Sequence, residues 1–486
     1  MITEDQQLTV QPEDYSLLTD LYQLTMAACY LGEGMAEQRA SFEIFVRRLP
    51  AGYGYLIAMG LAQALDYLNK FSFNDAQIKA LQDTGIFQDA PSEFWSLLRQ
   101  GKFTGDVWAV PEGTAVFANE PILRVEAPLW QAQLVETYLL NTINYQTLIA
   151  TKAARMRQAA GEEAVLLEFG TRRAFSPQGA VWAARAAIAG GMNGTSNVFA
   201  ALQLGRKPVG TIAHALIMAI ASQSGTEMDA FQAFQRYFPQ GSLLIDTYDP
   251  LEAARKLAAA VNAGTMSPGG VRIDSGNLAE LAHQVQALLP EVPIFVSGDL
   301  DEQEISKLRA AHAPIAGYGI GTKLVTGTPV NGVYKLVEIN GTPVMKESSG
   351  KITFPGRKQV WRRFRGGKIE VDRLGLITET PDYSANYSPN LALDDPESYA
   401  QNSQNYSQNS PTNFPEAIPL LKLVYYQGKQ LEAPESLATI SHRTSASVAS
   451  LPPEVCTLDN PQTPTIEISP ALEALVRKTQ KSLVLA

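Results

Sequence analysis

The sequence predicts an α/β protein in which an irregular β/α (TIM-like) barrel is joined to an α+β, sandwich-like domain built from both chain ends. From about Leu134, short apolar runs end in polar residues or glycine and mostly lead into helical patterns, as in a parallel sheet covered on both faces. At least six such units occur without a dinucleotide-binding fingerprint, which favours a barrel over an open sheet. Antiparallel strand signals before and after this region indicate the second domain.

The N-terminal part of the sandwich-like domain is predicted over residues 1–135. Apolar residues between 17 and 28 recur at helical spacing, with Thr19 or Asp20 available as the N-cap. Residues 41–46 alternate in polarity, except at the apolar Phe45, which predicts a half-buried strand. Shorter strand-like pieces follow, interrupted by proline and glycine, so this part is expected to be α+β with antiparallel strands.

The barrel domain is predicted over residues 136–330, and a long helical pattern reaching residue 160 begins it. Short apolar runs then recur, each expected to form one strand of the barrel. The runs are AVLLEFGTRR, PVGTIAHA, SLLIDTYDP, GGVRIDSGN, VPIFVSGDLD and IAGYGIGTK.

Residues 331–486 are predicted to return to the first domain with further β structure. Asn340-Gly341 stands between two strand patterns, which is a strong hairpin signal. A strand pair is expected within residues 420–432, and a terminal helix from Ser469 onward. Residues 381–415 are rich in Asn, Ser, Gln, Tyr and Pro, which predicts a disordered or mobile insertion.

The composition, with 45% hydrophobic and 18% charged residues, is close to that of an ordinary soluble globular protein. A net charge of −10 argues against a general nucleic-acid binder or a protein that binds anionic membranes. The acidic, polar N-terminus is not typical of a signal peptide, and the two cysteines form neither a disulfide framework nor a metal-ligand spacing. We therefore expect a cytoplasmic protein without membrane or nucleic-acid partners.

Polar residues follow the predicted strands, and in a β/α barrel such residues gather at the end that carries the active site. Glycine-rich turns after the last two runs expose backbone N–H groups that could hold phosphate, and the arginines suit an anionic substrate. Asp274 shares a strand face with Arg272 and could hold a sugar hydroxyl or a metal. The sequence thus predicts a phosphate-handling enzyme. Its strand-end residues are Arg172, Arg173, Asp246, Arg272, Asp274, Ser297, Gly298, Asp299, Gly319, Gly321 and Thr322.

His214 directly follows the predicted strand PVGTIA, in an uncharged stretch that extends to Gln223. It could be a core histidine whose ring nitrogens are satisfied by backbone groups, or a reactive group at the mouth of a site. Its place at the carboxyl end of a predicted strand groups it with the polar strand-end residues and is compatible with the second interpretation.

Eight segments occur in an order and at spacings that resemble a known family: DLYQLTM, FEIFVRRLP, LEFGTRRA, GGMNGTSNV, GTIAHA, LLIDTYD, VRIDSGNL and YGIGTKLVT. On these segments the chain resembles nicotinate phosphoribosyltransferase from Asp20 to about Arg363, and more loosely to the C-terminus. The family reaction joins nicotinate to 5-phosphoribosyl 1-diphosphate, forms nicotinate mononucleotide and releases diphosphate. Hydrolysis of ATP is coupled to it.

The resemblance implies a head-to-tail homodimer whose active sites lie at the subunit interface. Phe169 would stack on the pyridine ring and Arg172 would lie at the nicotinate site. Tyr22 would come from the other subunit and cover the second face of the ring. Arg272 and Asp274 would hold the ribose and its phosphates.

The remaining implied roles concern phosphate. His214 would attack the terminal phosphate of ATP, and the resulting phosphohistidine would couple hydrolysis to synthesis. Mg²⁺, whose ligands the residues do not identify, would neutralise the departing diphosphate. A cup for the 5′-phosphate would be formed by Gly298, Asp299, Gly319, Gly321 and Thr322.

Three alternatives differ from this interpretation in testable ways. Relatives that use nicotinamide carry an Asp in the motif matching GTSN, where this chain has Ser196, and an acid there would repel the carboxylate of nicotinate. Quinolinate-specific relatives are shorter, have a denser basic pocket and match these motifs less well. A catalytically silent metabolite sensor would be expected to have lost some strand-end residues, and none is missing here.

Overall fold

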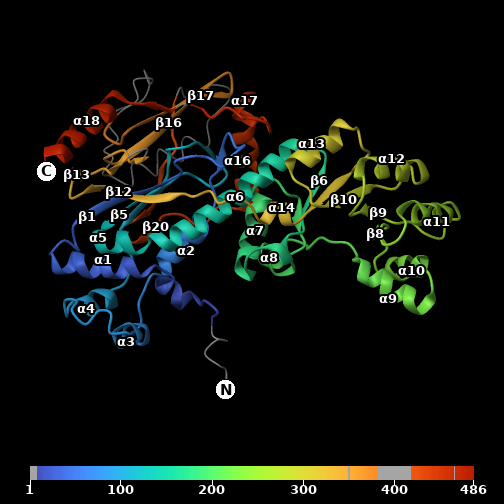
Figure 1. Ribbon diagram of the computed structural model, residues 1–486, viewed down its shortest axis with the longest axis horizontal. Coiled ribbons are helices and arrows are strands. Elements are labelled where there is room, and N and C mark those ends of the chain that lie inside the picture. The colour runs from blue at the N-terminus through green and yellow to red at the C-terminus, as the bar shows by residue number, and fades with distance from the viewer. Residues whose placement is uncertain (1–7, 349–350, 380–416, 465, 486) are drawn as a thin grey trace. The chain divides into compact units, whose positions relative to one another are not determined.

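The computed structural model describes residues 8–348, 351–379, 417–464 and 466–485 (Figure 1). The chain divides into two compact units. Unit 1 comprises Met1–Thr147, Pro329–Ser436 and Ala446–Ala486, and unit 2 comprises Leu148–Thr328 with Leu437–Ser445. The insertion predicted over 381–415 lies outside the described residues.

Unit 1 is built around a seven-stranded sheet whose paired neighbours are antiparallel, in the order β13-β12-β1-β5-β3-β19-β20. β1 lies between a strand from its own end of the chain and a strand from the far end, because it pairs with both β5 and β12. Strands from both ends of the chain therefore build one sheet. In sheet order, the bounds are Thr342–Pro343, Val333–Ile339, Arg39–Phe45, Pro121–Pro128, Asp106–Ala109, Lys422–Tyr426 and Lys429–Gln430.

A second sheet of unit 1 has the order β18-β16-β17-β21, and the described part of this unit also contains two separate strand pairs. The four bounds are Ile418–Pro419, Lys358–Arg365, Lys368–Leu376 and Ile466–Ile468; the pairs are β2 (Leu56–Ile57) with β4 (Ala115–Val116) and β14 (Glu347–Ser348) with β15 (Lys351–Ile352). The helical elements are η2 (Pro12–Leu17), α1 (Leu21–Gly32), α2 (Leu61–Lys70), α3 (Asp75–Asp83), α4 (Phe94–Arg99), α5 (Leu129–Leu134), α17 (Pro453–Cys456) and α18 (Pro470–Leu485). Two helices, α6 (Glu136–Ala160) and α16 (Leu437–Ser450), contribute residues to both units.

Several local predictions for unit 1 are confirmed. The first long helix begins at Leu21 with Asp20 as its N-cap residue, and the terminal helix is present as α18. Asn340 and Gly341 have φ angles of 47° and 75° between β12 and β13, so the predicted hairpin turn uses two left-handed residues. The strand pair expected within residues 420–432 is β19 with β20.

The half-buried pattern predicted for residues 41–46 was wrong, since all six residues of β1 after Arg39 are buried. The face that carries Ser41 and Glu43 is covered by residues of the second sheet rather than by solvent. Glu43 accepts a hydrogen bond from the backbone N–H of Lys358 at 3.0 Å, and its carboxylate lies 2.9 Å from Lys358 Nζ. A polar residue in an alternating strand is thus buried here because a distant lysine pairs with it.

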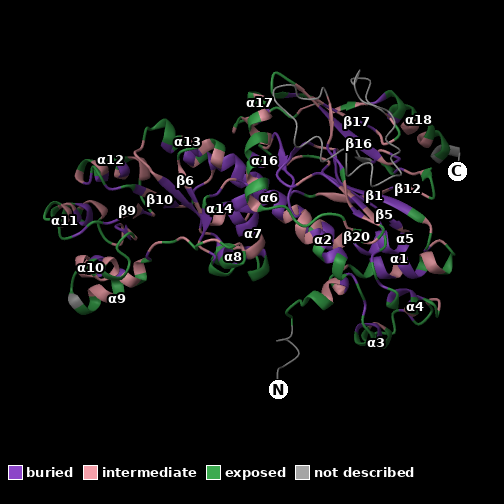
Figure 2. Cartoon of the chain, turned by 180° about the vertical axis from the view of Figure 1, so that it is seen from behind, coloured by how far each residue is buried: buried purple, intermediate pink, exposed green. Residues whose placement is uncertain are grey.

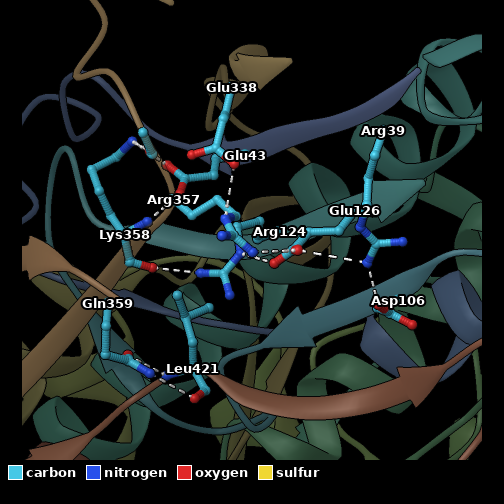
Figure 3. A network of polar contacts seen from close by, with 11 residues as sticks. Arg39, Glu43, Asp106, Arg124, Glu126, Glu338, Arg357, Lys358, Gln359 and Leu421 are labelled. Carbon is cyan, nitrogen blue, oxygen red and sulfur yellow. Dashed lines mark hydrogen bonds and ion pairs between the residues drawn. The ribbon is translucent and has the colours of Figure 1, made fainter. Parts of the chain in front are cut away.

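This ion pair belongs to a buried polar network between the two sheets (Figure 3). Arg124 on β5 donates to Glu126 at 2.8 Å and to the backbone carbonyl of Lys358 at 2.6 Å. Arg357 approaches Glu126 at 3.1 Å. Burial lowers the pKa of Lys358, while Glu43 opposes that change. Because burial of a charged group is unfavourable, each charge of this network depends on an oppositely charged or hydrogen-bonding partner.

Lys358→Met is expected to destabilise unit 1 by about 3–5 kcal/mol, because it leaves the carboxylate of Glu43 buried without its cation. Lys358 Nζ also donates to the carbonyls of Phe354 and Gly356, and these bonds are lost as well. Urea denaturation measures the change. Lys79→Met removes the cation of an exposed pair with Asp83 and should change the free energy of unfolding by less than about 1 kcal/mol. Equal effects of the two variants would contradict the prediction.

Unit 2 contains a six-stranded parallel sheet in the order β7-β6-β11-β10-β9-β8. The bounds in this order are Gly194–Thr195, Val165–Glu168, Gly317–Ile320, Ile294–Gly298, Gly270–Ile273 and Ser242–Leu244. Figure 2 shows the strands mostly buried, while α10, α11 and α12 each present buried and exposed residues. The α/β class and five of the six predicted strand runs are confirmed. Within the described residues, no strand pairing joins β7 to β8, so the pairing alone does not close a barrel.

The helices of unit 2 follow the strands as the sequence predicted, except that three helices, α8, α9 and α10, lie between β7 and β8. They are η3 (Thr171–Arg173), α7 (Pro177–Ala189), α8 (Val198–Gln203), α9 (His214–Ser224), α10 (Glu227–Tyr237), α11 (Pro250–Asn262), α12 (Leu278–Leu288), α13 (Glu302–Ala310) and α14 (Thr322–Val325). None of the helices in the described part of the chain is long and apolar enough to cross a membrane.

The prediction of a strand at PVGTIA was wrong. Residues 208–213 adopt no regular secondary structure, and the sixth strand is β7, which lies in the segment GGMNGTSNV. Pro208 has no N–H to donate to a ladder, and the backbone N–H of Val209 bonds to the carbonyl of Thr195, the last residue of β7, at 3.0 Å. His214 is therefore the first residue of α9, preceded by an irregular segment, rather than a residue at a strand end.

Candidate functional site

A cavity of about 660 Å³ lies in unit 2, at the carboxyl ends of β6, β9, β10 and β11. Polar loops converge there because parallel strands place their carboxyl ends at one edge of a sheet. The residues that line it are Phe169, Thr171, Arg172, Arg173, Ser196, Gly210, Thr211, Ile212, Ala213, His214, Arg272, Asp274, Ser297, Gly298, Asp299, Gly319, Gly321 and Thr322.

One wall is formed by the turn that follows β6. Phe169 donates its backbone N–H to the carbonyl of Ile320 at 2.7 Å, which ties the turn to β11. A Cβ atom on Gly319 would lie 2.5 Å from Cε2 of Phe169, so the ring packs against a position that only glycine can occupy. Arg172 and Arg173 follow on η3 and are exposed to solvent. This wall offers an aromatic ring with two cations beside it.

The neighbouring wall carries Ser196, directly after β7. Its backbone N–H donates to the carbonyl of Glu168 at 2.9 Å, so the two walls are joined through the end of β6. Asn197 caps the short helix α8 by accepting from the N–H of Ala200 at 2.9 Å. Ser196 is the residue of this wall that lines the cavity.

Arg272 is the most buried cation of the cavity, with a side chain 13% exposed. It donates to Asp274 at 3.3 Å and to Ser297 at 3.1 Å. Burial lowers the pKa of Arg272 and nearby Arg172 acts in the same direction, while Asp274 and Asp246 raise it. Its Nε atom is buried without a hydrogen-bond partner among the described residues, which leaves a donor available to an anionic ligand.

Asp274 is held from two sides. Its carboxylate accepts from Ser297 Oγ as well as from Arg272, and its backbone N–H donates to Asp246 at 2.8 Å. Asp246 also accepts from Ser275 Oγ at 2.8 Å. The position of the Asp274 carboxylate is therefore fixed by partners on β9, β10 and the loop after β8.

His214 lines the same cavity and is half-buried. Its Nδ1 atom lies 3.1 Å from the hydroxyl of Thr247. Arg272 donates to the carbonyl of Ile212 at 2.9 Å, which fastens the segment that precedes the histidine. Because Nδ1 lies beside Thr247, the other ring nitrogen, Nε2, remains available to a ligand. The cavity position makes His214 a group of the site, not an enclosed core histidine.

Glycine-rich turns close the far side of the cavity. Gly298 has φ of 114°, and a Cβ there would lie 2.7 Å from the carbonyl oxygen of Asp274, so this turn requires glycine. Asp299 follows it, and Gly321 and Thr322 follow β11. Their backbone N–H groups and the Thr322 hydroxyl are donors suited to phosphate oxygens.

The structure thus brings the predicted site residues to one cavity, except Tyr22 and Asp246. Asp246 does not line the cavity but accepts a hydrogen bond from the backbone N–H of Asp274, which does. Tyr22 lies on α1 in unit 1 and is 48% exposed; burial of its hydroxyl, with Glu136 and Asp20, raises its pKa. Five further residues line the cavity and were not predicted as site residues: Thr171, Gly210, Thr211, Ile212 and Ala213. Each lies within four residues of a predicted site residue, and this proximity in sequence is the only signal that could have identified them. No group of three or more metal-ligating side chains was found in the described part of the chain.

The chain is similar throughout to proteins of one family. Family profiles described as the nicotinate phosphoribosyltransferase (NAPRTase) N-terminal domain, the NAPRTase family and its C-terminal domain match residues 17–144, 165–365 and 357–476. Nicotinate phosphoribosyltransferase pncB2 of Mycobacterium tuberculosis is 43% identical over 375 residues, covering 74% of this chain and 78% of that protein. The Bos taurus nicotinate phosphoribosyltransferase is 32% identical over 526 residues, covering 95% and 96%. The crystal structure of human nicotinic acid phosphoribosyltransferase aligns with a TM-score of 0.78 at 30% identity, covering 95% of this chain and 99% of that one.

Proposed function

Because the chain belongs to the nicotinate phosphoribosyltransferase family, we propose that it joins nicotinate to 5-phosphoribosyl 1-diphosphate with coupled hydrolysis of ATP. One observation carries the proposal: a single cavity unites an aromatic wall, a buried arginine with an aspartate, glycine-rich turns and His214. Each of these features suits a different part of the reaction.

The aromatic wall suits nicotinate. Its pyridine ring would stack on Phe169, and its carboxylate would pair with Arg172 at the exposed end of the same wall. Ser196 on the other wall adds a neutral polar group. The absence of an acid at this position favours the anionic substrate over its amide.

The opposite side suits the phosphoribosyl group. Arg272 and Asp274 would hold the ribose and its phosphates, and the 5′-phosphate would lie on the turns at Gly298, Asp299, Gly319, Gly321 and Thr322. The transition state has oxocarbenium character, so catalysis rests on placing the ring nitrogen against the anomeric carbon and on stabilising diphosphate.

The cavity also fits Mg²⁺ bound together with substrate. This ion is usually held by one or two carboxylates and by substrate phosphates, and Asp274 and Asp299 supply two carboxylates beside the hydroxyls of Ser297 and Thr322. When bound, Mg²⁺ would neutralise charge on the diphosphate.

His214 would couple ATP to synthesis. Its Nε2 would attack the γ-phosphorus of ATP, forming an N–P bond while the bond to ADP breaks. The hydrogen bond between Nδ1 and Thr247 would hold the ring for this attack. Hydrolysis of the phosphohistidine would return the free imidazole.

We propose further that the enzyme is a homodimer and that unit 2 is a closed β/α barrel. Leu21 and Tyr22 on α1 are exposed, at 52% and 48%, as are Phe199 and Leu202 on α8 beside Ser196. Such apolar exposure at two separate places supports burial against a second copy, with Tyr22 completing the ring pocket of its partner. The irregular segment 208–213 would close the barrel between β7 and β8.

The proposal is tested by supplying the enzyme with 5-phosphoribosyl 1-diphosphate, Mg²⁺ and ATP, with nicotinate, nicotinamide or quinolinate as the acceptor. We expect nicotinate mononucleotide as the main product and a higher rate with ATP than without it, as measured by chromatography of the products. A clear preference for nicotinamide or quinolinate would contradict the assignment.

Gly319→Ala is expected to raise KM for nicotinate about tenfold, because a methyl group there must displace the Phe169 ring. Gly210→Ala is the matched control, since it lines the same cavity and a Cβ there meets no atom within 4 Å. Steady-state kinetics with nicotinate varied check the difference. Similar KM values for both variants would show that the ring position does not depend on Gly319.

A further inference from the structure

Glu168 is a buried acid that none of the roles above uses. It is the last residue of β6, it is 1% exposed, and it lies directly before Phe169. In the parallel sheet it lies opposite Ile320 of β11 on one side and Thr195 of β7 on the other. An acid at such a place is expected to have a specific reason, because burying a carboxylate is costly.

The side chain of Glu168 links the two walls of the cavity. One carboxylate oxygen accepts from the backbone N–H of Gly170, in the turn that carries Phe169. The other oxygen accepts from the hydroxyl of Thr195 at 2.5 Å, and Thr195 directly precedes Ser196 on the second wall. Both partners donate, so the acceptor-only carboxylate satisfies them together.

The link continues into the second wall. Thr195 Oγ accepts from the N–H of Asn197 at 2.9 Å, and Asn197 in turn caps α8. Ser196 thus stands between Thr195, which donates to the Glu168 carboxylate, and Asn197, which donates to Thr195. The backbone N–H of Ser196 itself donates to the carbonyl of Glu168. On the first wall, a Cβ on Gly170 would lie 2.9 Å from Glu168 Oε1, so the turn closes tightly over the carboxylate.

We propose that Glu168 is a positioning residue that sets the separation of Phe169 and Ser196, and hence the fit of the pyridine ring. This inference rests on the proposed function, since the ring is that of nicotinate. Burial raises the pKa of Glu168, and the hydrogen bonds from Thr195 and Gly170 offset only part of that rise. In the described part of the chain, the side chains of Arg272 and Asp274 bond to each other, to Ser297 and to the carbonyl of Ile212, and not to Glu168 or Thr195, so their hold on the phosphoribosyl group should be independent of this network.

The test compares Thr195→Val, which removes the hydroxyl at nearly constant shape, with Thr195→Ser, which keeps it. Titration calorimetry measures the affinities for nicotinate and for 5-phosphoribosyl 1-diphosphate with Mg²⁺ in separate experiments. Thr195→Val should weaken nicotinate binding about tenfold, the effect of one buried hydrogen bond. Thr195→Ser should stay within about threefold of wild type for nicotinate, and both variants within about twofold for 5-phosphoribosyl 1-diphosphate.

Glu168→Gln provides a second variant, because its amide can accept from Gly170 but leaves the Thr195 hydroxyl without an acceptor. It should weaken nicotinate binding selectively, as Thr195→Val does. Unchanged nicotinate affinity in Thr195→Val and Glu168→Gln, or parallel loss of both ligands with a lower Tm, would overturn the positioning role. A wild-type enzyme that binds no nicotinate would overturn the proposed function itself and this inference with it.

Discussion

His214→Ala is expected to eliminate the phosphate that terminally labelled ATP transfers to the protein. In the wild type, the label should be acid-labile and base-stable, as an N–P bond requires. The reason is geometric: His214 lines the cavity, and its Nδ1 is near Thr247, which leaves Nε2 for the proposed attack on phosphorus. The variant should also lose the stimulation of synthesis by ATP, while synthesis without ATP continues.

The control is another of the four histidines. His283 is exposed on α12 and its ring contacts the carbonyl of Ala311 at 3.2 Å, outside the residues that line the cavity. His283→Ala should keep full labelling. Label that persists in His214→Ala would refute the phosphohistidine.

Ser196→Asp is expected to lower kcat/KM for nicotinate about 100-fold, because a carboxylate placed against the carboxylate of the substrate costs several kcal/mol. Nicotinamide carries no such charge and can donate to the new acid, so its kcat/KM should rise. Competition between the two substrates at equal concentration measures the change in preference.

Ser196→Asn separates charge from size, since asparagine is nearly isosteric with aspartate and neutral. It should retain nicotinate activity within about tenfold of wild type. If Ser196→Asn loses as much nicotinate activity as Ser196→Asp, the discrimination depends on space in the wall and not on charge.

Much of unit 2 could be predicted because its signals are local. Apolar runs such as SLLID and VPIFV are continuous, so each strand is recognisable alone, and the polar residues after them lie at one edge once the strands are parallel. The prediction of a strand at PVGTIA was wrong because it also relied on a local signal, a short apolar run. Pro208 cannot donate a backbone hydrogen bond, and one backbone bond to β7, from Val209 to Thr195, is too little to make the segment a strand. The two-residue strand β7 has too few residues to show any periodicity.

What could not be predicted depends on partners distant in sequence. Glu43 in an alternating pattern indicates a solvent-facing position, and only Lys358, which the fold brings to it, explains its burial. Glu168 stands beside the recognisable Phe169, but its role becomes visible only when Thr195 is known to lie opposite. That Tyr22 reaches the site of a second subunit remains a prediction, because it depends on a contact outside this chain.

The pairing of β1 with both β5 and β12 has a consequence for how the chain is made. Ala40 lies opposite Ile339, and Val107 of β3 lies opposite Tyr425 of β19, so the large sheet cannot be completed until nearly all residues have been synthesised. Unit 2 draws almost entirely on the continuous stretch Leu148–Thr328 and can fold before that point. During translation, β1 lacks its partner β12 and β3 lacks its partner β19, so each has one unpaired edge. Unpaired strand edges promote aggregation. A chain that ends near residue 330 would hold a folded unit 2 attached to only three strands of the seven-stranded sheet, β1, β3 and β5.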